Sequence, residues 1–102
     1  MANKAGIRIS KSQIGEFCRR YHIQRLSLFG SVLRDDFSQA SDVDVLVEFE
    51  SGEKIGLLRM AHIENELSKL LGRQADFRTP EDLSRYFRQE VIESAEVQYA
   101  KG

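Results

Sequence analysis

The chain has few of the features that mark secreted, membrane-spanning or nucleic-acid-binding proteins. Its single cysteine, Cys18, excludes an internal disulfide and falls within an apolar helical stripe, which favours a buried thiol in a reducing compartment over a reactive one. No apolar run approaches the ~20 residues of a membrane span, and the N-terminus lacks a signal-peptide core. We therefore expect a cytoplasmic protein without membrane contact.

Charge is also close to balanced. The sequence has 15 basic and 16 acidic residues and a formal charge of −1, whereas non-specific nucleic-acid binding needs clustered positive charge. Direct nucleic-acid binding is therefore not expected, although a local basic patch is not excluded. At 102 residues, 41% of them hydrophobic, the chain is expected to form one domain over 1–102, in which 1–9 lacks periodicity and is partly mobile.

Short apolar runs predict the strands of a small sheet. They are Arg25–Phe29, Val43–Phe49 and Gln74–Arg78, and the tail Val97–Gly102 could add a short edge strand. The second run is the richest in β-branched and aliphatic residues, which fit a pleated, buried surface.

Apolar residues at helical spacing predict the helices. The first helix opens at Ser10 in a capping box with Gln13, and a long one carries Leu57 to Leu71 and ends at Gly72. Further predicted segments are a short helix Ser31–Asp36, a loop Phe37–Ser41, and a helix from Thr79-Pro80 to about Ser94 that could break midway. Strands alternating with helices predict an α/β fold, a small mixed sheet flanked by helices.

Two carboxylates lie together at the start of the Val43–Phe49 strand. Asp42 and Asp44 are two residues apart, so their side chains share a face, with Cα atoms ~6.5–7 Å apart. Such a pair repels unless positive charge lies between its members. Mg²⁺ suits this place because it prefers carboxylate oxygens and completes its shell with water and phosphate. Asp42 alone could instead cap a turn with Ser41, an interpretation that the second acid at Asp44 disfavours.

Gly30-Ser31 follows the preceding strand and predicts an anion site. Glycine at a strand end lets backbone N–H groups approach a ligand closely, and a strand–turn–helix corner gathers such donors. Ser31 adds a hydroxyl, and Arg34 can reach back toward the same anion, although an ion pair with Asp35 or Asp36 explains it equally well. The pattern indicates phosphate on one side of the site and metal on the other.

These residues together resemble a known signature. Gly30-Ser31, ten further residues and then Asp42-x-Asp44 is similar to the motif of the DNA polymerase β-like nucleotidyltransferase superfamily. The small size of the chain and its sequence LFGSVLRDD…SDVDVLVEFE resemble those of the minimal nucleotidyltransferases, which are commonly antitoxin partners of HEPN-domain toxins. The likeness runs from about Arg25 to the C-terminus. It departs at 32–35, where VLRD replaces a stretch that often carries another arginine and a glycine.

The resemblance implies the nucleotidyltransferase fold and a catalytic triad of acids. On this basis Asp42, Asp44 and a third acid, Asp76 on a neighbouring strand, hold Mg²⁺ and are the catalytic residues. From the residues alone, Asp76 could be satisfied by an ion pair with Arg73 or Arg78 instead.

The resemblance also implies a substrate and a partner. Gly30, Ser31 and Arg34 would bind ATP, and AMP would pass to a tyrosine of a HEPN-domain toxin, with which the chain would form a hetero-oligomer. A chain this small has little mass for a separate acceptor-recognition domain, so another protein is expected to supply the acceptor. Two rivals remain: an antitoxin that masks the toxin by contact alone, and a nucleic-acid-binding repressor or RNA-tailing transferase.

Overall fold

The computed structural model describes residues 10–30 and 42–101, and every structural statement below concerns those residues. The elements in chain order are α1 (Lys11–Arg20), β1 (Ile23–Phe29), β2 (Val43–Phe49), α2 (Leu57–Leu71), β3 (Ala75–Arg78), the 3-10 turn η2 (Pro80–Asp82), α3 (Arg88–Ser94) and β4 (Glu96–Ala100). The predictions made for 1–9, for the helix Ser31–Asp36 and for the loop Phe37–Ser41 lie outside the described residues. No helix in the described ranges has the length and apolar character needed to cross a membrane.

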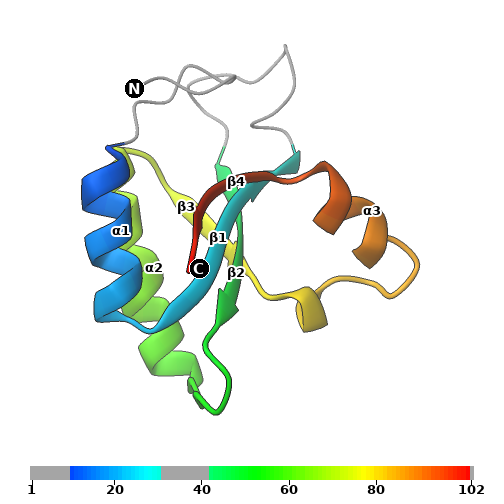
Figure 1. Ribbon diagram of the computed structural model, residues 1–102, viewed down its shortest axis with the longest axis horizontal. Helices are drawn as coiled ribbons and strands as arrows, with labels where there is room; N and C mark the ends of the chain where they lie inside the picture. Colours follow the sequence, from blue (N-terminus) through cyan, green and yellow to red (C-terminus); the bar gives the residue numbers. More distant parts are fainter. Residues whose placement is uncertain (1–9, 31–41, 102) are drawn as a thin grey trace.

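A four-stranded mixed sheet forms the centre of the molecule (Figure 1). The strand order is β3-β2-β1-β4, with β1 antiparallel to both of its neighbours and β2 parallel to β3. The predicted small mixed sheet is thus confirmed. The tail does form an edge strand, which begins at Glu96 and pairs with β1.

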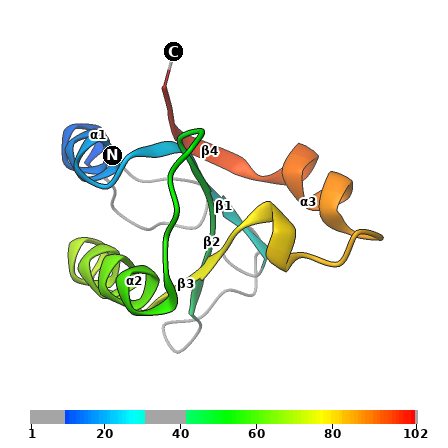
Figure 2. The same ribbon diagram turned by 90° about the horizontal axis from the view of Figure 1, so that it is seen from below.

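Helices α1 and α2 cover one face of the sheet, while α3 lies on the other side (Figures 1 and 2). Along β2 the side chains of Val43, Val45 and Val47 enter the core under α1 and α2, where they meet Ile63 and Leu67 of α2. The alternate residues of β2 therefore project from the opposite face, because side chains alternate along a strand. This second face, which carries Asp44, is called the site face below.

The two long helices begin and end where local chemistry predicts. Ser10 caps α1, its hydroxyl accepting a hydrogen bond from the Gln13 backbone N–H at 3.3 Å. Gly72 caps α2 in the left-handed region, with φ 70°, and its N–H donates to the Ser68 carbonyl at 2.9 Å. The predicted glycine cap of α2 is confirmed, and of the capping box predicted at Ser10 the bond from the Gln13 N–H to the Ser10 hydroxyl is confirmed.

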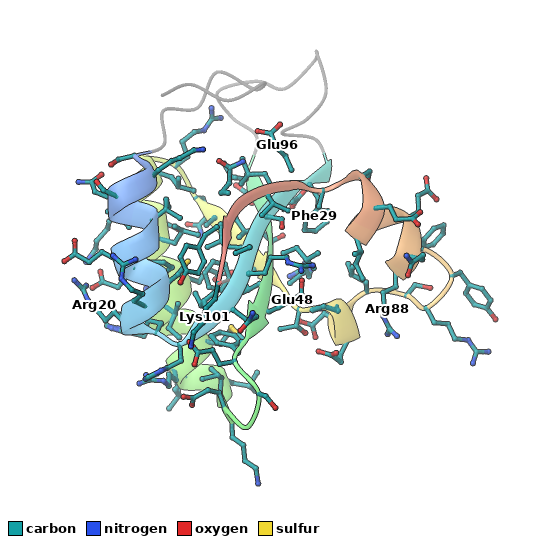
Figure 3. The ribbon with its side chains drawn as sticks, in the orientation of Figure 1. Arg20, Phe29, Glu48, Arg88, Glu96 and Lys101 are labelled. Carbon is teal, nitrogen blue, oxygen red and sulfur yellow. The ribbon has the colours of Figure 1, made fainter. Side chains whose placement is uncertain are left out.

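The segment after Thr79 is not one helix but two short pieces. The Asp82 carboxylate accepts a hydrogen bond from the Thr79 N–H at 3.0 Å in a capping box that opens η2, which ends after a single turn. The Arg88 guanidinium then donates to the carbonyls of Pro80 at 2.7 Å and Leu83 at 3.2 Å (Figure 3). Because those carbonyls are satisfied by a side chain, the backbone need not continue as a helix, and α3 starts only at Arg88.

Cys18 leads to a testable expectation about stability at high pH. The thiol is buried in the core, and this burial raises its pKa from 9.0 to about 12, opposed in part by the nearby charge of Arg19. Above pH 9.0 the unfolded chain releases the thiol proton while the folded chain retains it. The contribution of the protonated thiol to the free energy of unfolding is therefore complete below pH 9.0 and is lost between pH 9.0 and about 12.

Urea denaturation of the wild type and Cys18→Ala across that pH range tests this expectation. The alanine variant should be less stable because of its smaller side chain, and this loss should not depend on pH. Only the wild type should lose stability as the pH rises, so the difference in free energy of unfolding between the two proteins should become smaller. Two curves that stay parallel would show that the thiol does not titrate in this way.

Candidate active site

Asp44 and Asp76 are direct neighbours across the parallel β2–β3 pair. The register pairs Val43 with Ala75, Asp44 with Asp76 and Val45 with Phe77. Paired residues on neighbouring strands share a face, with backbones about 4.8 Å apart. The carboxylates of Asp44 and Asp76 therefore both project from the site face, each partly buried, whereas Val43 and Ala75 beside them are fully buried.

Gly30 packs directly against Asp44. It follows Phe29, the last residue of β1, which pairs with Asp44 in the antiparallel β1–β2 register. The glycine has φ 73°, a left-handed conformation that side chains rarely adopt, and a Cβ added here would collide with Oδ2 of Asp44. Glycine is required here both by its backbone conformation and by the space that the carboxylate occupies.

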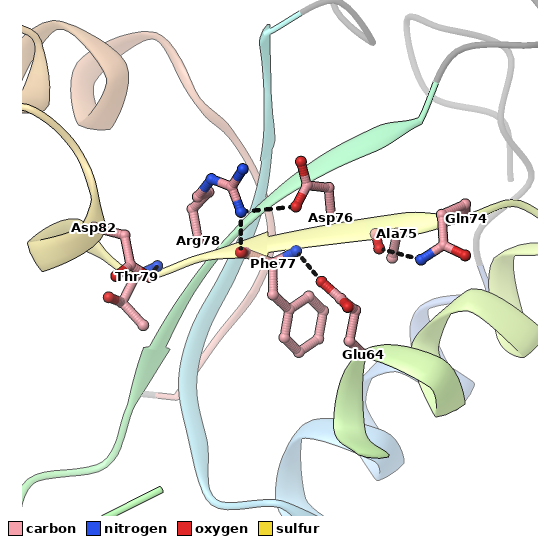
Figure 4. Close-up of polar contacts among 8 residues, drawn as sticks. All are labelled: Glu64, Gln74, Ala75, Asp76, Phe77, Arg78, Thr79 and Asp82. Atoms are coloured by element: carbon pink, nitrogen blue, oxygen red, sulfur yellow. Dashed lines mark hydrogen bonds and ion pairs between the residues drawn. The ribbon is translucent and has the colours of Figure 1, made fainter. Parts of the chain in front are cut away.

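Asp76 is ion-paired within its own strand. Nη1 of Arg78 lies 2.8 Å from Oδ1 of Asp76 and also donates to the Phe77 carbonyl at 3.0 Å (Figure 4). Of the two arginines that the sequence left open as partners, the structure thus places Arg78 on this carboxylate. The positive charge beside the Asp76 carboxylate is therefore supplied by Arg78 of the chain itself.

Of the other predicted site residues, Asp42 is the one that lies among the described residues. Asp42 is exposed and precedes β2, while Ser31 and Arg34 lie outside the described residues. Within 10–30 and 42–101, no three side chains of the histidine, cysteine, aspartate and glutamate types form a ready metal-binding group. The described part of the site is therefore a pair of adjacent carboxylates backed by Gly30.

The donor set of this pair suits Mg²⁺. Both side chains offer hard carboxylate oxygens, and Mg²⁺ is commonly bound by one or two carboxylates together with substrate phosphates and water rather than by a complete protein cage. The guanidinium already seated on Asp76 shows that this position accepts positive charge. The residues present thus fit a metal that arrives with a phosphate ligand.

Two polar residues of α2 hold β3 in place, and the sequence did not single them out. The Glu64 carboxylate accepts a hydrogen bond from the Phe77 N–H at 2.7 Å (Figure 4), and the Ser68 hydroxyl accepts one from the Ala75 N–H at 2.8 Å. These bonds satisfy the outer edge of β3 on both sides of Asp76. The available signal was the spacing of Glu64 and Ser68, four residues apart on α2 beside Ile63 and Leu67, which brings both to one side of the helix.

Comparisons with known proteins agree on one family. The sequence pattern of the family described as "Nucleotidyltransferase domain" matches residues 10–98. A proposed protein adenylyltransferase of Methanocaldococcus jannaschii, MJ0435, is 31% identical over 85 residues, which cover 83% of this chain and 89% of that protein.

Solved structures show the same fold. The structure of a proposed minimal nucleotidyltransferase is 33% identical, with a TM-score of 0.68 and coverage of 83% of this chain and 85% of that one. A chain from the complex of tri-AMPylated Shewanella oneidensis HEPN toxin with MNT antitoxin is only 18% identical, but it superposes with a TM-score of 0.63 over 89% of this chain and 70% of its own. The second likeness is one of fold alone.

Proposed function

Because this chain belongs to the nucleotidyltransferase domain family and is a nucleotidyltransferase enzyme, we propose that it transfers AMP from ATP to a tyrosine of a HEPN-domain toxin and so acts as its antitoxin. The observation that carries the proposal is the Asp44–Asp76 pair, in register on one face and backed by Gly30. The relative named as a proposed protein adenylyltransferase and the fold shared with the AMPylated toxin complex support the acceptor class.

Each residue has a defined part in this mechanism. Gly30 and Ser31 would cradle the β- and γ-phosphates of ATP with backbone N–H groups and a hydroxyl, and Arg34 would add a positive charge. Asp42, Asp44 and Asp76 would hold Mg²⁺, which when bound neutralises the triphosphate and stabilises the leaving pyrophosphate.

The transfer itself needs no covalent intermediate. The tyrosine oxygen of the partner forms a bond to the α-phosphorus while the bond between that phosphorus and the bridging oxygen to the β-phosphate breaks. The phenolic proton passes to the Asp76 carboxylate, and pyrophosphate leaves with the electron pair of the broken bond. The chain therefore acts by positioning and by charge, which is how phosphoryl-group chemistry is generally catalysed.

Incubation of the purified protein and its cognate HEPN partner with Mg²⁺ and radiolabelled ATP tests the proposal. Label in the α-phosphate should appear on the partner, and label in the γ-phosphate should not, because AMP rather than phosphate is transferred. Replacing the acceptor tyrosine of the partner by phenylalanine should remove the signal. A tight complex in which neither protein becomes labelled would favour neutralisation by masking and would contradict the proposed transfer.

A further inference from the structure

Arg78 lies on the site face beside the two carboxylates. It is two residues from Asp76 on the same strand, so the two side chains share a face, and in the β2–β3 register it pairs with Leu46, two residues from Asp44. Its Nη1 contacts Oδ1 of Asp76 at 2.8 Å. The positive charge of Arg78 is therefore located where the proposed metal and nucleotide would bind.

The contact between Arg78 and Asp76 is of a kind that breaks readily. The Arg78 side chain is 48% exposed and the Asp76 side chain 33% exposed, so water screens the pair. Asp76, Arg78 and the Phe77 carbonyl that Arg78 also contacts all belong to one short edge strand, so these contacts tie the arginine to no other element.

Within residues 10–30 and 42–101, the rest of the guanidinium makes no hydrogen bond. Among the described residues only Nη1 has acceptors, Asp76 and the Phe77 carbonyl, so Nε and Nη2 retain their hydrogens for another partner. The planar fork of arginine matches two oxygens of a phosphate at once, which a lysine ammonium cannot do.

Two other arginines on this side of the sheet are engaged elsewhere. Arg25 pairs with Glu48 at 3.6 Å, farther along the β1–β2 pair, and Arg88 is bound to backbone carbonyls between η2 and α3 (Figure 3). Arg78, in contrast, contacts the site carboxylate of Asp76.

We propose that Arg78 is a nucleotide-binding residue that exchanges partners, holding Asp76 when no nucleotide is bound and turning its guanidinium to a phosphate of ATP on binding. This inference rests on the proposed function of the same site. A metal ion alone must compete with Arg78 for the Asp76 carboxylate. When nucleotide binds as well, Arg78 turns to a phosphate and the carboxylate can bind the metal without this competition. Metal and nucleotide should therefore bind synergistically, each raising the affinity for the other.

Binding measurements on the full chain, without any partner, test the exchange. Arg78→Met removes the charge at similar length, so Mn²⁺ alone, followed by electron paramagnetic resonance, should bind roughly 3- to 10-fold more tightly than to the wild type. Calorimetry with AMP-PNP and Mg²⁺ should show roughly 10- to 100-fold weaker nucleotide binding, because a charge-assisted bidentate contact is lost. Arg78→Lys should leave Mn²⁺ affinity near that of the wild type but still weaken nucleotide binding.

Arg25→Met is the matched control, since it removes an ion-paired arginine from the same face away from Asp76, and it should change neither affinity. Circular dichroism melting curves confirm that each variant is folded. Unchanged or weakened Mn²⁺ binding in Arg78→Met, or nucleotide binding equal to that of the wild type, would overturn the exchange. None of these readouts needs AMP transfer, so failure of the transfer assay would leave the exchange standing, and the reverse also holds.

Discussion

Asp44→Asn is expected to lower the rate of AMP transfer by roughly 1,000-fold or more, which corresponds to about 4 kcal/mol of transition-state stabilisation. Asp44 lies on the strand between Gly30 and Asp76: its Oδ2 is next to Gly30, and the β2–β3 register pairs it with Asp76. An amide has nearly the same shape but no charge, and it is a poor ligand for Mg²⁺. The rate of labelled AMP incorporation into the HEPN partner measures the effect.

Glu48→Gln is the matched control for that substitution. Glu48 projects from the same face of β2, also undergoes an acid-to-amide change, and pairs with Arg25 at 3.6 Å on a partly exposed surface. Loss of such an ion pair costs about 0–1 kcal/mol of stability and should leave the transfer rate within roughly twofold of the wild type. If Asp44→Asn kept more than roughly a tenth of the activity at an unchanged melting temperature, Asp44 would not be the central metal ligand that we propose.

Gly30→Ala is expected to damage both the fold and the site. Alanine at φ 73° has the strain of a left-handed residue, about 1–2 kcal/mol, and its Cβ would push against Oδ2 of Asp44. Together these effects should lower the free energy of unfolding by about 2–4 kcal/mol and the affinity for AMP-PNP with Mg²⁺ by roughly 100-fold. Urea denaturation and calorimetry measure the two losses separately.

Gly72→Ala separates the backbone effect from the contact with Asp44. Gly72 has φ 70°, nearly that of Gly30, but a Cβ added there would meet no heavy atom within 4 Å. This variant should lose only the conformational contribution, about 1–2 kcal/mol, and should bind nucleotide as the wild type does. Equal losses of nucleotide affinity in the two variants would mean that the space beside Asp44 is not what requires glycine at position 30.

Much of the site's placement could be predicted because it depends on local rules. The alternation of side chains along Val43–Phe49 puts Asp44 on the face opposite the valines of the core, and this needs only the extended backbone. Gly30 at the end of β1 and Gly72 at the end of α2 likewise follow from the conformations that glycine alone adopts readily. The roles assigned to the three aspartates and to Gly30, Ser31 and Arg34 remain predictions until the variants are measured.

The partners of the site residues could not be predicted in the same way. Arg73 and Arg78 are both close to Asp76 in the sequence, and the ion pair with Arg78 depends on the strand geometry that places residues two apart on one face. The break between η2 and α3 depends on Arg88, whose bonds to Pro80 and Leu83 reach across a bend that no helical periodicity indicates. Glu64 and Ser68 act on β3 only because α2 packs along that edge.

The sequence by itself determined where α1, α2 and the four strands lie, which face of β2 enters the core, and the glycine-serine and aspartate motif that indicates the nucleotidyltransferase family. Only the tertiary structure decided that β3 lies parallel to β2 with Asp76 opposite Asp44, and that Arg78 occupies the space beside them. The physical reason is that local propensity depends on a residue and its near neighbours, whereas register between distant strands is set by how the whole core and its edge hydrogen bonds fit together.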